Sequence, residues 1–316
     1  MSNEKIKQIK IIFMGTPDFA VPAFIKLIQD KRFNVVSVIT QPDKKVGRKQ
    51  ALTPPPIKQV AEKFHVQVLQ PNKISGAFSE ISNLKPDFIV VIAYGQILPK
   101  EILDIPKYGS INIHGSLLPK YRGASCVQAA ILNNDKKTGV TIILMDEKID
   151  TGHILKQGQI SIDDEETAQT LHNKLAELGA NILPETIINY VSKKITPKPQ
   201  DNSRANYVCQ LKKQDGKINW EKPAKEIERM VRALNPWPGT FTKLAGKIIK
   251  ILNVENKILK ININKIGQLF IYKDMLAVQC GKDALIINKL QIEGKKIISG
   301  NDFMQGYKEL VNNILK

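Results

Sequence analysis

Residues 87–93 read DFIVVIA, a run that is apolar at every position after its first residue. Such an uninterrupted apolar run is typical of a central strand that is covered on both faces, as in a parallel sheet flanked by helices. Other short, β-branched runs occur throughout residues 1–150, and helical patterns separate them. This alternation predicts an α/β domain with a mostly parallel sheet.

The expected elements of this domain follow the apolar runs along the chain. Strands are predicted at residues 10–14, 35–40, 66–70, 88–93, 110–114, 140–145 and 153–162. Helices are predicted at residues 21–29, 57–64, 76–84, 127–132 and 167–191. We place the domain at residues 1–192.

A second, smaller domain is expected after a linker. Residues 193–204 read KKITPKPQDNSR, which combines prolines and polar residues without periodicity, and we place the linker at 193–210. A helix is predicted at 224–234. Short β-like runs separated by Gly or Asn then predict a small β-barrel within residues 211–316, with strands at 248–254, 268–271, 276–279 and 284–290.

Composition restricts the class of protein. The 316 residues are 42% hydrophobic and 24% charged, which is typical of a globular protein and excludes collagen, coiled coil and wholesale disorder. No apolar run reaches the roughly 20 residues of a membrane span, and the N-terminus has no signal-peptide pattern. The three cysteines, Cys126, Cys209 and Cys280, are too widely spaced for a disulfide framework. We therefore expect a cytoplasmic protein without a membrane partner.

The charge of the chain indicates a polyanionic partner. The formal net charge is +17, from 47 basic and 30 acidic residues. Residues 206–316 carry 20 basic against only 10 acidic side chains, so the excess is concentrated in the C-terminal part. A cationic surface that only aids solubility is the alternative. A second basic stretch, QPDKKVGRKQALTPPP at residues 41–56, has little to bury and is expected to be a projecting loop.

Candidate catalytic side chains are concentrated in SINIHGSLLPKYRG, residues 110–123, which begins with a predicted strand. Period-two alternation places Asn112 and His114 on one side of that strand. They lie toward its C-terminal end, and open α/β sheets bind ligands at the carboxyl ends of their strands. Asp150, in MDEKIDTGHI, is expected at the close of the next strand, before a Thr-Gly turn, where a carboxylate can orient an imidazole. The alternatives are satisfied polar residues at a strand end and ordinary turn chemistry.

Other kinds of site are disfavoured. The turn MGTPDFAVP, residues 14–22, contains neither a GxGxxG nor a GxxxxGK[ST] pattern, which argues against a dinucleotide or P-loop site. None of the four histidines has a partner at metal-ligand spacing, so no metal is expected. Cys126 as a nucleophile remains an alternative without an identified base.

Five motifs in order, MGTPDFAVP, QPDKKVGRK, IVVIAYGQILP, NIHGSLLPKYRG and DEKIDTGHI, resemble those of the folate-dependent formyltransferases. The resemblance implies a Rossmann-like N-terminal domain that binds 10-formyltetrahydrofolate and a C-terminal OB-like β-barrel domain that binds tRNA. Two further motifs, INW at 218–220 and RALNPWPG at 232–239, are similar to motifs of those family members that act on charged initiator tRNA. The implied activity is transfer of the formyl group to the α-amine of methionyl-tRNA, by a monomer.

The resemblance also assigns residues. Asn112, His114 and Asp150 are implied as catalytic. The folate pocket is implied to involve Ala93, Tyr94, Gly95, Ile97, Leu98, Ser116, Leu117, Leu118 and Pro119, and the tRNA acceptor end to meet Lys44, Lys45, Arg48 and Lys49. Ser125, Cys126 and His153 depart from the family pattern, which we interpret as variation at the rim of the pocket.

Three alternative functions share this pattern. A sugar-nucleotide formyltransferase and a formyl-folate hydrolase would use the same catalytic core, but neither requires the basic C-terminal segment or the basic stretch at 41–56. A non-catalytic RNA-binding protein would have no evident need for Asn112, His114 and Asp150 together.

Overall fold

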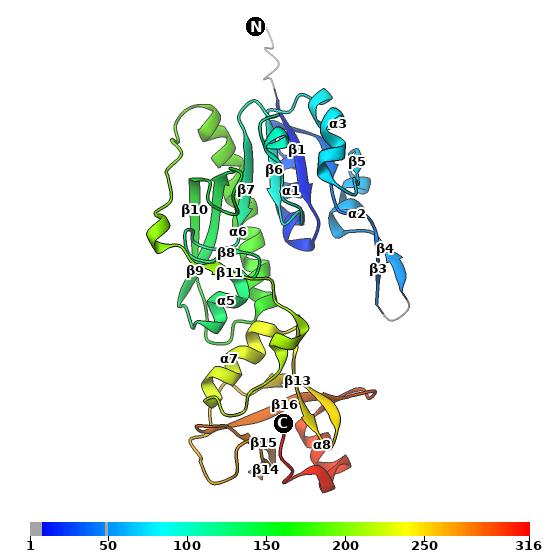
Figure 1. Ribbon diagram of the computed structural model, residues 1–316, viewed down its shortest axis with the longest axis vertical. Helices are drawn as coiled ribbons and strands as arrows, with labels where there is room; N and C mark the ends of the chain where they lie inside the picture. The colour runs from blue at the N-terminus through cyan, green and yellow to red at the C-terminus, as the bar shows by residue number, and fades with distance from the viewer. Residues whose placement is uncertain (1–7, 48–49) are drawn as a thin grey trace. The chain divides into compact units, whose positions relative to one another are not determined.

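The computed structural model describes residues 8–47 and 50–316. The chain forms two compact units (Figure 1). The N-terminal unit comprises the described residues within 1–123, together with Thr138–Ile160 and His172–Val208. The C-terminal unit comprises Ala124–Lys137, Ser161–Leu171 and Cys209–Lys316, so each is assembled from separate stretches of chain.

The N-terminal unit is built on a seven-stranded sheet with the order β10-β9-β7-β6-β1-β2-β5. Its strands are β1 (Ile9–Gly15), β2 (Phe33–Ile39), β5 (Val68–Leu69), β6 (Phe88–Ile92), β7 (Ser110–His114), β9 (Lys137–Leu144) and β10 (His153–Ser161). The pairs from β5 through β7 are all parallel, whereas β9 runs antiparallel to β7. The prediction of a mostly parallel sheet is confirmed.

Burial explains why these segments form the centre of the sheet. Every residue of β6 is buried, and Ile12, Phe13 and Met14 of β1 have no exposed surface. Burying an apolar side chain of this size contributes about 1.5–3 kcal/mol. The accompanying helices are α1 (Val21–Gln29), α2 (Pro56–Lys63), α3 (Phe78–Asn83), α4 (Lys100–Leu103) and α6 (Ala168–Val191).

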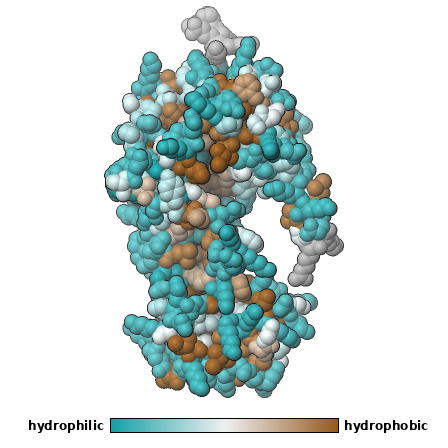
Figure 2. Space-filling model, viewed as in Figure 1, coloured by the Kyte–Doolittle hydropathy of each residue, from teal (hydrophilic) through white to brown (hydrophobic). Residues whose placement is uncertain are grey.

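The basic stretch at 41–56 differs from the expected loop, because it contains a two-stranded hairpin. Strands β3 (Lys44–Val46) and β4 (Ala51–Thr53) pair antiparallel, and all of their residues are exposed. The hairpin extends away from the sheet in Figure 1, and in Figure 2 it carries hydrophobic as well as hydrophilic side chains. The hydrophobic ones include Val46 and Leu52, which are 55% and 68% exposed.

The C-terminal unit contains an antiparallel sheet with the order β12-β13-β16-β15-β14, and β17 pairs with β16. The strands are β12 (Thr240–Leu244), β13 (Lys247–Val254), β14 (Leu269–Tyr272), β15 (Met275–Gln279), β16 (Ala284–Ile292) and β17 (Ile297–Ser299). Helices α5 (Cys126–Leu132), α7 (Ala224–Leu234) and α8 (Gly300–Gly306) belong to this unit. The expected β-rich C-terminal domain is confirmed.

Within residues 8–47 and 50–316, no helix combines the length and the apolar character that a membrane span requires.

Candidate active site

Strand β7 carries three polar side chains on one face, and Ser110, the first of them, is buried and donates a hydrogen bond to the carbonyl of Leu103. Asn112 lies between Val91 of β6 and Ile143 of β9, and it is partly exposed. In the part of the chain that the structure describes, its carboxamide makes no hydrogen bond to another residue. His114, two residues further along, is buried. The period-two prediction for this pair agrees with the observed strand, and the Asn112 amide is available to a ligand.

The two ring nitrogens of His114 have different neighbours. Nε2 lies 2.8 Å from the carbonyl oxygen of Tyr121, and Nδ1 lies 3.5 Å from Oδ2 of Asp150. A carbonyl oxygen can only accept a hydrogen bond, so Nε2 donates and carries a proton. The other ring nitrogen, Nδ1, faces the carboxylate of Asp150.

Asp150 reaches His114 by a different route from the one the sequence suggested. Because β9 is antiparallel to β7, Leu144 at its end pairs with Ile111, away from His114. The following loop returns and places Asp150 beside the imidazole, with Asp150 itself in the left-handed region at φ 56°. Its Oδ2 also accepts a hydrogen bond of 2.7 Å from the backbone N–H of Gly123. The carboxylate is thus held between the imidazole and a backbone donor.

Two loops next to β6 and β7 contain the residues expected to bind folate. In the first, Ala93, Gly95 and Ile97 are exposed, and Ile97 is 71% exposed, whereas Tyr94 and Leu98 are buried. In the second, Ser116 and Leu118 are buried and the side chains of Leu117 and Pro119 are partly exposed. The exposed members offer apolar surface to a ligand, and the buried members anchor the loops in the core.

Hydrogen bonds hold the loop at Ser116–Pro119 against the neighbouring strand. Thr141 of β9 donates to the carbonyl of Ser116 and accepts from the N–H of Leu118, at 2.6 and 3.0 Å. Gln157 of β10 donates to the carbonyl of Leu118 at 2.9 Å. In the loop after β6, burial raises the pKa of the Tyr94 phenol from its ordinary value of 10 to about 12.

The residues expected to contact tRNA lie on the hairpin. Lys44 and Lys45 are exposed on β3, while Arg48 and Lys49 lie outside the described residues. At the root of the hairpin, Asp43 accepts hydrogen bonds from Nε2 of Gln70 at 2.7 Å and from Nζ of Lys58 at 3.0 Å. The hairpin is therefore tied to the domain at its base, whereas its strands face solvent.

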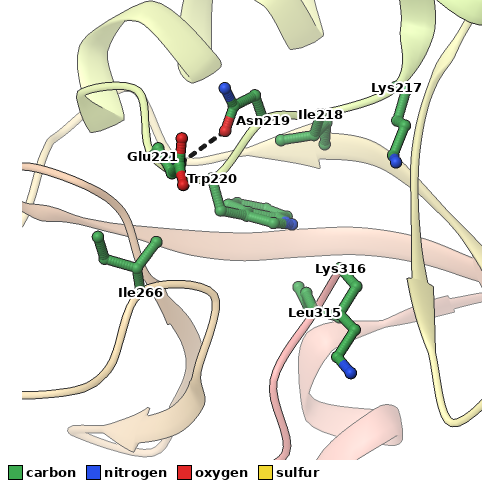
Figure 3. Close-up of a pocket in the computed structure, with 8 residues that line it drawn as sticks. All are labelled: Lys217, Ile218, Asn219, Trp220, Glu221, Ile266, Leu315 and Lys316. Carbon is green, nitrogen blue, oxygen red and sulfur yellow. Dashed lines mark hydrogen bonds between the residues drawn. The ribbon is translucent and has the colours of Figure 1, made fainter.

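The INW motif in the C-terminal unit has a structural role that the sequence did not reveal. Trp220 is buried and donates from Nε1 to the hydroxyl of Thr242 at 3.0 Å, and Ile218 belongs to the same core. Asn219 accepts from the N–H of Glu221 (Figure 3). These residues border a cavity of about 560 Å³, whose rim includes Lys217 and Lys316.

Sequence reasoning missed the contribution of the segment assigned as linker. Gln200 donates to the carbonyls of Asp150 and Gly152, and Asn206 accepts from the N–H of Tyr121. Arg122, in the YRG sequence, is buried and hydrogen-bonds to Gln200. A cavity of about 720 Å³ adjoins this arrangement and is lined by Arg122, Asp146, Glu147, Lys148, Thr151, Asn202, Ala205 and Tyr207.

The arrangement suits acyl transfer, because an amide donor, an imidazole and a carboxylate lie on neighbouring segments. Among the described residues there is no cluster of three His, Cys, Asp or Glu side chains suited to a metal ion.

Family comparisons agree with a transferase of this class. The family described as "Formyl transferase" matches residues 7–187, and "Formyl transferase, C-terminal domain" matches residues 210–308. The chain therefore belongs to the formyl transferase family.

Individual relatives match almost the whole chain. The protein is 45% identical over 312 residues to the methionyl-tRNA formyltransferase of Caldicellulosiruptor saccharolyticus, covering 96% of this chain and 99% of that one. It is 44% identical over 300 residues to the methionyl-tRNA formyltransferase of Bacillus velezensis, covering 94% of each chain.

Solved structures share the fold at lower identity. An N-formyltransferase from Helicobacter canadensis, in complex with folinic acid and dTDP-3-aminofucose, has a TM-score of 0.66 and 23% identity, covering 89% of this chain and 99% of that one. HypX from Aquifex aeolicus, in complex with tetrahydrofolic acid, has a TM-score of 0.62 and 16% identity, covering 96% of this chain and 48% of that one.

Proposed function

We propose that this protein transfers the formyl group of 10-formyltetrahydrofolate to the α-amine of methionyl-tRNA, giving N-formylmethionyl-tRNA. The observation that carries this proposal is the 43–45% identity to methionyl-tRNA formyltransferases over nearly the full length of both chains. Identity to a solved N-formyltransferase that holds an aminosugar nucleotide is only 23%. The extent of the match includes the basic C-terminal segment, which a small sugar substrate does not require.

Formyl transfer between two nitrogens makes two demands on the protein. Negative charge develops on the formyl oxygen as the amine attacks, and the attacking ammonium must first lose a proton. Asn112, whose carboxamide is not engaged by a described residue, serves as the hydrogen-bond donor to that oxygen. The new C–N bond forms first and gives a tetrahedral intermediate with its negative charge on the formyl oxygen; the intermediate then collapses as the bond to N10 breaks, the attacking nitrogen loses a proton, and N10 leaves with one.

His114 and Asp150 handle the proton in this proposal. Nε2 of His114 is committed to the carbonyl of Tyr121, which leaves Nδ1 facing the Asp150 carboxylate 3.5 Å away. Asp150 orients the imidazole and assists removal of the proton from the attacking amine. No covalent enzyme intermediate is required.

The residues present fit a folate donor. Ile97, Gly95 and Ala93 offer exposed apolar surface next to β6, and the loop at Leu117 and Pro119 offers a second surface next to β7. We propose that these two loops bind the donor. Lys44 and Lys45, together with Arg48 and Lys49, are proposed to contact the acceptor end of the tRNA.

We also propose the division of labour along the chain. Residues 1–192 form the catalytic domain, 193–210 the linker, and 211–316 an OB-like domain that binds initiator tRNA. The protein is proposed to act as a cytoplasmic monomer, which light scattering coupled to size-exclusion chromatography tests directly.

One assay tests the proposed activity. The protein is incubated with 10-formyltetrahydrofolate and either charged initiator tRNA or a dTDP-linked aminosugar, and the products are separated by mass. Formyl-methionine released from the tRNA supports the proposal. Formylation of the sugar alone, or consumption of the donor without an acceptor, contradicts it.

A further inference from the structure

Residues 198–208, which we call the strap, are fixed on both sides of the active site. At one end, Ile154, the second residue of β10, exchanges two backbone hydrogen bonds with Lys198, at 2.7 and 2.9 Å. At the other end, β11 (Tyr207–Val208) pairs in parallel with β8 (Arg122–Gly123). Between these two attachments the strap passes the loop that carries Asp150.

Gln200 is the side chain of the strap that contacts this loop. Its Nε2 donates to the carbonyl oxygens of Asp150 and Gly152, at 2.8 Å each. Asp150 occupies the left-handed region, which Asp tolerates better than most residues with a side chain. The two hydrogen bonds fix the backbone of the loop in this conformation on either side of Thr151.

Arg122 determines which way round the Gln200 amide lies. Nε and Nη2 of Arg122 donate to Oε1 of Gln200 at 3.2 and 2.8 Å. Since a guanidinium can only donate, the amide oxygen faces Arg122 and the NH₂ group faces the two carbonyls. Arg122 also donates to Asn202 and Tyr207, and no carboxylate in the described part of the chain pairs with it.

The strap also supports His114, the residue that faces Asp150. Oδ1 of Asn206 accepts a hydrogen bond of 2.6 Å from the N–H of Tyr121, and the carbonyl of Tyr121 accepts from His114. The backbone of Asn206 accepts from the N–H of Arg122 at 2.9 Å. Both His114 and Asp150 are therefore supported by side chains of one segment.

We propose that Gln200 is a positioning residue, which holds the Asp150 carboxylate against His114 and the Gly123 N–H. The inference rests on the proposed function, because it assigns Asp150 a part in formyl transfer. Gln200 itself touches no reacting atom; it acts through the backbone of the loop.

Gln200→Glu is the decisive variant. A glutamate retains the size of the side chain and an acceptor for Arg122, but it cannot donate to the carbonyls of Asp150 and Gly152. If the only role of Gln200 were to accept the hydrogen bonds of Arg122, this variant would behave like the wild type. Displacement of Asp150 should instead lower kcat about 10- to 100-fold, because small errors in the placement of catalytic groups are costly. Both KM values should change by less than about threefold, because ground-state binding is retained.

Asn202→Asp provides the matched control. It makes the same chemical change on the same strap and next to the same guanidinium, to which the Asn202 side chain is bonded rather than to the Asp150 loop. Its kcat should remain within about twofold of the wild-type value. Gln200→Ala, which removes the amide altogether, should lose kcat as Gln200→Glu does and provides a second variant if the first does not fold.

A readout that needs no substrate makes the two proposals separable. The Gly123 amide donates to Asp150, so its NMR signal in ¹⁵N-glycine-labelled protein reports where the carboxylate lies. In Gln200→Glu this signal should shift and exchange faster with solvent, whereas in Asn202→Asp it should not. An unchanged Gly123 signal, or wild-type kcat in Gln200→Glu, overturns the role of Gln200. A wild-type protein that fails to formylate methionyl-tRNA refutes the proposed function, while the Gly123 signal still decides the role of Gln200.

Discussion

The Asn112 carboxamide is not engaged by any described residue, although His114 on the same face of β7 contacts two groups. Because its backbone is fixed in a rigid strand and its amide is not already hydrogen-bonded, the Asn112 side chain can donate a hydrogen bond to negative charge that develops on a substrate. Asn112→Ala should therefore lower kcat by about 10²- to 10³-fold, the usual cost of losing one such donor. Single-turnover rates at saturating tRNA and donor measure this directly.

Ile113→Val serves as the control for this change. Ile113 lies on the opposite face of β7 and is buried, so its truncation should cost about 0.5–1.5 kcal/mol of stability and leave kcat unchanged. A single-turnover rate for Asn112→Ala that matches the control would exclude Asn112 from the reaction.

Asp150→Asn removes a charge but retains an oxygen that can accept from Gly123. The loop should keep its position, and the turnover number should fall by about 10²- to 10⁴-fold, as expected when a proton-transfer group is lost. Asp146→Asn makes the same change in the same loop. The Asp146 carboxylate accepts hydrogen bonds from Lys148 and Thr151 rather than facing His114, so this variant should remain active. Equal rates for the two variants would contradict the assignment.

These residues also mark how far the sequence could predict the site. Period-two spacing was sufficient to place Asn112 and His114 together, because a strand fixes which side chains share a face. Asp150 was identified, but its route was not, since the return of its loop depends on the direction of β9. Gln200 could not be found, because its partners are backbone carbonyls 48 and 50 residues away.

The β3–β4 hairpin depends on Asp43 for its attachment. A hydrogen bond from Gln70, together with the neighbouring Lys58 ammonium, holds the pKa of this carboxyl below its ordinary value of 3.8. If the hairpin binds tRNA, Asp43→Ala should raise the KM for tRNA by about 2- to 10-fold, because it removes the hydrogen bonds from Gln70 and Lys58 at the root of the hairpin. The KM for the folate donor should not change.

The same carboxylate predicts a dependence on pH. Because its folded pKa is lowered, Asp43 contributes stability above its ordinary pKa and loses that contribution as the pH falls through the lowered value. The difference in Tm between the wild type and Asp43→Ala should therefore shrink below about pH 4. Asp104→Ala removes an equally charged but largely exposed carboxylate and should leave the KM for tRNA unchanged. Equal tRNA KM values for the two variants would dissociate Asp43 from tRNA binding.

Strands and helices were predicted best where burial decides them. Helix α1 and strand β7 have the predicted bounds, because each presents apolar residues at the spacing of its own periodicity. The hairpin was not predicted, since β3 and β4 bury nothing and their exposed residues leave no pattern of burial. Strand direction was also beyond reach, because β9 would have the same buried residues in either orientation.

Each unit is built from separate stretches of the chain, and this limits how the role of the C-terminal positive charge in tRNA binding can be tested. A chain ending at Arg204 would lose Asn206, which supports Tyr121 and through it His114. Such a truncation would also remove residues 205–208 from the N-terminal unit and separate α5 from α7, with which it packs. Any loss of tRNA binding would then be confounded with damage to the active site, so substitution of lysines in the intact protein is the better test.

Three exposed lysines share one face of the C-terminal sheet: Lys243 on β12, Lys250 on β13 and Lys289 on β16. Lys250 lies opposite Phe241, two residues from Lys243, and also opposite Gln291, two residues from Lys289, so alternation places all three on the same side. Lysines that neutralise phosphates release condensed counterions, which makes affinity fall steeply with salt.

Replacing these three lysines with glutamine should weaken binding of methionyl-tRNA and make the plot of log affinity against log salt shallower. The slope should fall by about 0.7–0.9 for each phosphate that is no longer neutralised, while binding of the folate donor stays constant. The matched control replaces Lys10, Lys31 and Lys85, which are exposed at or just before the starts of β1, β2 and β6 in the N-terminal unit and give the same reduction of net charge. Equal slopes for the two triple variants would mean that the effect follows net charge alone, and that this face of the C-terminal sheet does not contact the tRNA.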